Sequence, residues 1–194
     1  TYYRTRNLLA RGAVAEAFSE STDTFRVGYG RINKGSTSID NVNTRVIEAG
    51  VRDFTPARKS ALFDYLYSLP AEGGTPLRLA MQEAGNYYSR TDNRGPWSEV
   101  PGSVNTAADK TCRRSYHLLV TDGYWSDSVG SGGLVAVGND DNTNGPNITG
   151  PGQSFQYLAP RPYRDGSSDT LADYAMKYWK NDLRPTLDNK VVAS

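Results

Sequence analysis

The chain has 194 residues, which suits a single domain. Its 22 lysines and arginines balance 21 aspartates and glutamates, so bulk charge does not favour binding to nucleic acid or to a membrane surface. Frequent glycine (19) and proline (10) with 37% hydrophobic residues indicate a loop-rich globular protein, and no apolar run approaches the roughly 18 residues that span a membrane.

The N-terminal part of the chain is predicted to form a helix and then strands. Apolar residues at three- and four-residue spacing predict a helix over 3–18. Alternation with a period of two predicts a strand over 25–32, and weaker strand character follows over 44–51.

Two helices are predicted in the middle of the chain. The first covers 57–68 and is followed by a proline that ends it. The second covers 76–89, with Thr75 expected as its N-cap and Pro76 as its first residue. Thr75 therefore presents a hydroxyl at a junction between a loop and a helix, a place that the capping role alone also explains.

A short apolar run within 116–121 predicts a buried strand that ends at the turn Thr121-Asp122-Gly123. Such a strand places the Asp122 carboxylate at the carboxyl edge of a sheet, where ligands bind in open α/β folds, although a plain turn also accounts for it. A carboxylate and the Thr75 hydroxyl above one sheet edge suggest a site for a hard cation, since Mg²⁺ and Ca²⁺ prefer oxygen ligands.

The C-terminal part combines a long irregular region over 128–168 with a final helix over 169–183, for which Asp169 is the expected N-cap. Helices that alternate with short strands indicate an α/β sandwich.

The motifs at 73–78 (Gly-Gly-Thr-Pro-Leu-Arg) and 118–125 (Leu-Leu-Val-Thr-Asp-Gly-Tyr-Trp) resemble those of a von Willebrand factor A domain. Over nearly its whole length the chain resembles, more narrowly, the PilY family of bacterial type IV pilus-tip proteins. Further fragments that carry this resemblance lie at 25–33, 63–71, 138–146 and 170–180.

The resemblance implies a Rossmann-like three-layer α/β sandwich over residues 1–194, with a mostly parallel sheet flanked by helices. In that family a metal-ion-dependent adhesion site joins an Asp-x-Ser-x-Ser motif, a threonine and an aspartate, and the last two match Thr75 and Asp122. The first motif is absent here, so we expect it and the first central strand upstream of Thr1, and the last strands beyond Ser194. Mg²⁺ or Ca²⁺, with Mn²⁺ as a substitute, is the implied ion, and Asp127 is a second-shell candidate that would hydrogen-bond a metal-bound water.

The function implied by the resemblance is non-catalytic adhesion, surface sensing and support of pilus assembly at the cell surface, reached through the periplasm and outer membrane. The implied partners are minor pilins or other tip components, a host or abiotic surface ligand, and the remainder of the parent protein. Two alternatives remain: a structural module with a vestigial metal site, and an A-domain subunit of an ATPase- or chelatase-type complex.

Three further residue groups are weaker candidates. Asp140, Asn142 and Asn144 match the first half of an EF-hand calcium loop, although a loop rich in Asx turns explains them as well. Cys112, the single cysteine, is either a small buried residue or the partner in a disulfide to a cysteine outside this segment. His117, the single histidine, is predicted to be a core or rim residue without a catalytic role.

Overall fold

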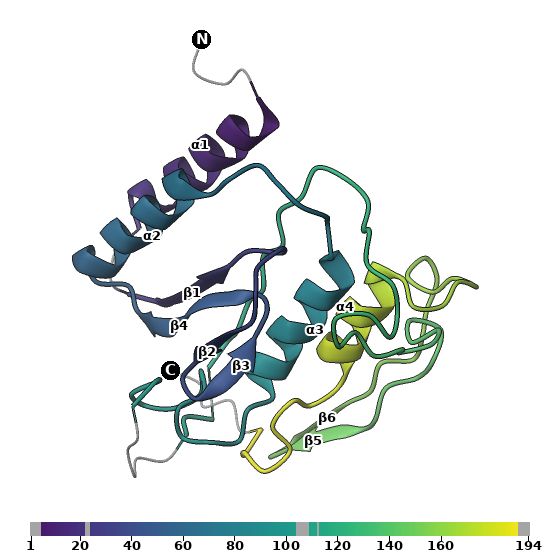
Figure 1. Cartoon of the computed structure of the whole chain (residues 1–194). Coiled ribbons are helices and arrows are strands. Elements are labelled where there is room, and N and C mark those ends of the chain that lie inside the picture. The colour runs from purple at the N-terminus through teal and green to yellow at the C-terminus, as the bar shows by residue number, and fades with distance from the viewer. Residues whose placement is uncertain (1–4, 22–23, 104–108, 112, 190–194) are drawn as a thin grey trace.

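The computed structural model of the chain describes residues 5–21, 24–103, 109–111 and 113–189. Its helices and short strands come in groups along the chain, with long irregular connections in the second half (Figure 1). In chain order the elements are α1 (Arg6–Ser19), β1 (Arg26–Gly30), β2 (Thr37–Ile39), β3 (Val42–Thr44), β4 (Ile47–Asp53), α2 (Pro56–Ser68), α3 (Leu77–Tyr88), β5 (Ile148–Gly150), β6 (Gln153–Phe155) and α4 (Leu171–Lys180).

Helices α1 and α2 pack against each other beside the antiparallel β1–β4 pair (Figure 1). Aromatic rings join these layers: the Phe54 centroid lies 5.8 Å from that of Phe18 and 5.7 Å from that of Phe25. Tyr29 of β1 and Tyr65 of α2 are 5.1 Å apart, centroid to centroid. Ring contacts of this kind add to the free energy gained by burying the apolar area.

Helices α3 and α4 form a second packed unit (Figure 1). Leu79, Leu134 and Tyr174 make its buried core, and the Tyr174 hydroxyl donates to the Val135 carbonyl at 2.7 Å. Gly85 explains how closely the two helices approach, because a Cβ there would lie 2.2 Å from the Tyr178 ring. A larger residue at this position would force the Tyr178 ring to move.

The four predicted helices and the first predicted strand are confirmed with small shifts of their bounds. Two predicted caps are wrong. Helix α3 begins at Leu77 with Pro76 as N-cap and has no side-chain cap hydrogen bond from its own loop, so Thr75 does not cap it. Helix α4 is capped by Thr170, which forms a capping box with Asp173, and not by Asp169.

The predicted buried strand over 116–121 is wrong for this structure. No strand is assigned there, and Tyr116 and Leu118 are 81% and 76% exposed. The physical reason is the absence of a neighbour: within the described ranges, no backbone–backbone hydrogen bond involves residues 113–125. A strand forms only where an adjacent chain accepts and donates these bonds.

The three sheets of the described residues are antiparallel pairs: β1 with β4, β2 with β3, and β5 with β6. The mostly parallel sheet of an A domain therefore stays a prediction. The region 128–168 is irregular apart from the β5–β6 hairpin. In the part of the chain that the structure describes, no helix has both the length and the apolar character to cross a membrane.

Candidate functional site

The loop before α3 and the segment 125–127 are joined directly, although about 50 residues separate them. The Thr75 amide donates to Ser126 Oγ at 2.7 Å, and the Ser126 amide donates to the Thr75 carbonyl at 2.9 Å. We call this contact the Thr75–Ser126 junction. It fixes the position of Thr75 relative to the chain that follows Asp122.

Asp127 supplies the cap that α3 lacks in its own loop. Its side chain is 6% exposed, and its Oδ2 accepts a hydrogen bond from the Leu79 amide at 2.9 Å. Its Oδ1 accepts from Arg78 Nε at 2.8 Å. A carboxylate at a helix N-terminus is favoured both by the free amide groups and by the helix dipole. Both carboxylate oxygens of the predicted second-shell residue thus already have protein donors.

Arg78 connects three segments around the junction. Besides the Asp127 side chain, its guanidinium donates to the Asp127 carbonyl and, at 2.8 Å, to the Asp169 carbonyl just before α4. It also lies 5.5 Å from the ring centroid of Trp125. Sequence analysis missed Arg78 and Ser126 as organising residues, because their partners lie far along the chain and no local pattern reveals them.

Asp122, in contrast, lies on the surface. Its side chain is 60% exposed and pairs with Arg6 Nη1 at 2.9 Å. Thr75 and Asp122 supply at most two side-chain donor groups, and within the described ranges no group of three or more His, Cys, Asp or Glu residues is placed to hold a metal ion. Mg²⁺ and Ca²⁺ need six or more ligands. The described residues therefore do not form a complete metal site by themselves.

The loop with the EF-hand-like sequence already surrounds a cation of the protein itself. The Lys180 ammonium of α4 is buried and donates to the Asp140 carbonyl at 2.6 Å, the Thr143 carbonyl at 3.0 Å and Thr143 Oγ1 at 2.6 Å. It also lies 3.1 Å from Asp140 Oδ2, as an ion pair without hydrogen-bond alignment. A calcium ion held by Asp140, Asn142 and Asn144 would have to compete with this lysine.

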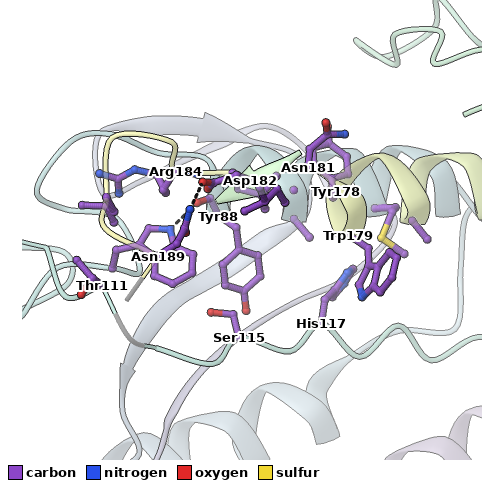
Figure 2. A pocket seen from close by; sticks show the side chains of 18 of the residues that line it. Tyr88, Thr111, Ser115, His117, Tyr178, Trp179, Asn181, Asp182, Arg184 and Asn189 are labelled. Carbon is purple, nitrogen blue, oxygen red and sulfur yellow. Dashed lines mark hydrogen bonds between the residues drawn. The ribbon is translucent and has the colours of Figure 1, made fainter. Parts of the chain in front are cut away.

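A cavity of about 510 Å³ lies between α3, α4 and the segment after α4. Figure 2 shows aromatic side chains from both helices in its wall, together with His117 and polar residues of 181–189. Burial raises the pKa of Tyr178 to about 12 and also raises that of Tyr88. Desolvation lowers the pKa of His117, which nevertheless exposes part of its surface at the rim.

Cys112 lies outside the described residues, so its predicted burial or external disulfide stays a prediction.

Comparison with known proteins shows a similarity that covers almost the whole chain. The chain is 37% identical over 191 residues to the "type IV pilus biogenesis factor PilY1" of Pseudomonas aeruginosa strain PAK, which is 98% of this chain and 16% of that protein. It is 37% identical over 196 residues to PilY1 of strain PAO1, and 35% identical over 195 residues to PilY1 of strain UCBPP-PA14. No family model and no solved structure matches.

The chain spans about one sixth of the length of these curated relatives, 15–16%. The alignment covers 98% of this chain, and more than one third of the aligned residues are identical. The comparisons therefore support a relationship to the PilY1 proteins.

Proposed function

We propose that this chain serves, without catalysis, in adhesion, surface sensing and pilus assembly at the tip of a bacterial type IV pilus. The observation that carries the proposal is the similarity of 98% of the chain to proteins named as type IV pilus biogenesis factors. Its partners would be minor pilins or other tip components, a host or abiotic surface ligand, and the remainder of the intact protein. Its location would be extracellular, reached through the periplasm and the outer membrane.

The surface proposed to meet the ligand is the loop edge that carries Thr75 and Asp122. The Thr75–Ser126 junction supports this choice, since it holds the Thr75 loop against the chain four residues after Asp122. Arg78 and Asp127 support it further, because their buried ion pair at 2.8 Å anchors the same segment to α3. A binding loop held on a rigid element keeps its geometry when a ligand docks.

We further propose that 116–121 becomes a strand of an A-type sheet in the intact protein. Alternate apolar residues of the segment are exposed: Tyr116, Leu118 and Val120. Its backbone groups make no backbone–backbone hydrogen bond within the described ranges. These are the features of a strand whose partner is another stretch of chain.

The proposal includes a divalent metal ion that helps to bind the ligand. Mg²⁺, Ca²⁺ or Mn²⁺ at this edge would require oxygen ligands from outside the described residues, in addition to Thr75 and Asp122. It would also require Asp122 to leave Arg6, with which it is paired at 2.9 Å. Both residues of that pair are well exposed, so the interaction to be broken is weak, about 0–1 kcal/mol.

Isothermal titration calorimetry of the full-length protein with Mg²⁺, Mn²⁺ and Ca²⁺ tests this part. We expect one metal to bind at this edge and Asp122→Ala to abolish that binding. Asp53→Ala is the matched control, since Asp53 is a similarly exposed aspartate paired with an arginine, Arg26, at 2.6 Å. Unchanged metal affinity in Asp122→Ala would refute the assignment of Asp122.

A structural module with a vestigial metal site is the second candidate, and specific contacts favour it. Asp122 is paired with Arg6, and both carboxylate oxygens of Asp127 have protein donors. This candidate predicts no metal-binding heat in the full-length protein, together with normal pilus assembly when Asp122 is replaced. Loss of pilus assembly or surface attachment in cells carrying Asp122→Ala, with the protein still folded, would exclude it.

A further inference from the structure

An aspartate or asparagine is followed directly by glycine at Asp122–Gly123, Asn144–Gly145 and Asp165–Gly166. In such a pair the glycine nitrogen can attack the side-chain carbonyl carbon, because glycine has no Cβ to hinder the approach. A C–N bond forms, water leaves from aspartate or ammonia from asparagine, and the product is a five-membered succinimide ring. Water then opens the ring to aspartate or to isoaspartate. The surroundings of each pair decide whether the glycine nitrogen can reach the carbon.

The sequence alone favours Asn144–Gly145, since an amide is attacked more readily than an ionised carboxylate. The structure opposes this choice. The Gly145 amide donates to the Tyr157 carbonyl at 2.8 Å, and Gly145 is buried. A Cβ at Gly145 would lie 3.2 Å from the Lys180 carbonyl oxygen, so the backbone has little room to turn. The nitrogen that would attack is therefore held away from the Asn144 side chain.

Asp165–Gly166 is exposed but held by hydrogen bonds on both sides of the aspartate. Asp165 Oδ1 accepts from the Ser167 amide at 2.6 Å, which turns the carboxylate toward that amide. The Asp165 amide donates to Asp141 Oδ1 at 3.3 Å, and its carbonyl accepts from Asn139 Nδ2 at 3.1 Å. The rotation that ring closure needs would break these bonds.

Asp122–Gly123 has the fewest restraints of the three pairs. The Asp122 side chain is 60% exposed, and its one ion pair, to Arg6, is weak because both side chains lie in water. Among the described residues the Gly123 amide donates only to Thr121 Oγ1, at the long distance of 3.4 Å. A Cβ at Gly123 would meet nothing within 4 Å. Within the described ranges, residues 113–125 make no backbone–backbone hydrogen bond that would resist the rotation.

We propose that Asp122 converts spontaneously to isoaspartate in the folded protein, faster than the other two pairs react. Water leaves as the succinimide forms and is taken up again as the ring opens, so the mass of the chain does not change. The product has one more carbon in its backbone and carries the carboxylate directly on Cα. For ligand or metal binding at the Thr75–Asp122 edge, a consequence that rests on the proposed function, the conversion moves the carboxylate from its place.

The test is to incubate the full-length protein at neutral pH, folded in one sample and unfolded in urea in the other. Peptide mass spectrometry with electron-transfer fragmentation then locates isoaspartate. The product at Asp122 keeps its mass, while reaction at Asn144 raises it, so the two are distinguished within one peptide. We expect isoaspartate to appear first at Asp122 in the folded sample. In urea the order should reverse, with Asn144 reacting fastest.

Gly123→Ala is the decisive variant. We expect it to slow the reaction at Asp122 about fivefold, because alanine lacks much of the backbone freedom of glycine. The open space around Gly123, whose φ is not positive, allows this variant to fold. Gly35→Ala is the matched control, since Gly35 has equally open surroundings and no positive φ, and it should leave the rate at Asp122 unchanged.

Three results would each overturn the proposal: no isoaspartate at Asp122 in the folded protein, a faster reaction there at Asn144 or Asp165, or an unchanged rate at Asp122 in Gly123→Ala. The measurement follows covalent structure and needs no metal or ligand. Its failure therefore leaves the proposed pilus function standing, and an absence of metal binding leaves this test unaffected.

Discussion

Asp122 and Asp127 lie in one short segment and have opposite surroundings. Asp122 is 60% exposed and pairs with Arg6, whose side chain is 83% exposed. Asp127 is 6% exposed, pairs with Arg78 and caps α3 through the Leu79 amide. The ion pairs have nearly the same N–O distance, 2.9 and 2.8 Å. Distance alone therefore does not show which aspartate stabilises the fold and which is free to act on a ligand.

The two aspartates differ in their burial and in the number of hydrogen bonds that they accept. An exposed pair gains little, because water and salt screen it and its side chains lose conformational freedom. A buried pair is costly to break, because the remaining charge stays out of water without its partner. The segment 116–127 thus combines an exposed part, where backbone and side chains have few partners, with a buried end that holds it on α3.

Removing the buried carboxylate should have the largest effect. Asp127→Ala leaves the Arg78 guanidinium without its carboxylate partner and removes the cap of α3. We expect a loss of about 4 kcal/mol in the free energy of unfolding. Urea denaturation followed by circular dichroism measures it.

Asp122→Ala is the paired control for this experiment and should change the free energy of unfolding by less than about 1 kcal/mol. Equal losses in the two variants would contradict the contrast between the two aspartates. A small loss in Asp127→Ala alone would show that the Asp127 carbonyl and the Asp169 carbonyl suffice to hold Arg78.

Lys180 extends the comparison to a second loop, where the buried charge is a cation. Lys180→Met removes the ammonium that three oxygens of Asp140 and Thr143 surround, and leaves buried carbonyls without a donor. We expect a loss of about 3 kcal/mol in the free energy of unfolding. Thermal unfolding measures this loss. The test for Ca²⁺ uses the Asp122→Ala variant, which lacks the aspartate of the proposed metal edge, and Ca²⁺ should not raise the melting temperature of that variant.

Lys177→Met, on the same helix, is the matched control, since Lys177 is half-buried and lies 5.7 Å from the Tyr178 ring centroid. Its effect should be below about 1 kcal/mol. If Ca²⁺ stabilised the Asp122→Ala variant while Lys180 stayed in place, the role of the lysine as the internal cation of this loop would be wrong.

The sequence predicted the helices because their signals are local. Spaced apolar residues and Pro56 mark α2, and similar spacing marks α1, α3 and α4. The cap of α3 was not predictable, because Asp127 lies 48 residues from the Leu79 amide that it accepts from. The apolar run within 116–121 did predict a strand, but a strand depends on a neighbour, and sequence pattern carries no information on whether one is present.

For the candidate site, too, the sequence predicted the residues that lie in local motifs and missed those whose partners are far along the chain. Thr75 and Asp122 were found from short motifs, since each follows a recognisable local pattern. The roles of Ser126 and Arg78 come from contacts across about 50 residues, and the ammonium of Lys180 reaches its loop from about 40 residues away. Charge–charge partners at such separations depend on the tertiary packing, which composition and periodicity do not specify.

The smallest expected effect on stability comes from protonation of His117, which lies in the exposed part of the segment 116–127. Desolvation lowers its pKa below the ordinary value of 6.5, so the unfolded chain binds its proton more readily than the folded one. The stability that the neutral imidazole contributes is therefore complete above about pH 6.5 and is lost as the pH falls through the lower folded pKa. Because the chain has one histidine, its C2–H resonance in proton NMR is unique and reports the pKa directly. A folded pKa at or above 6.5, or a stability profile that His117→Gln leaves unchanged in this pH window, would show that the His117 imidazole is solvated like that of an unfolded chain.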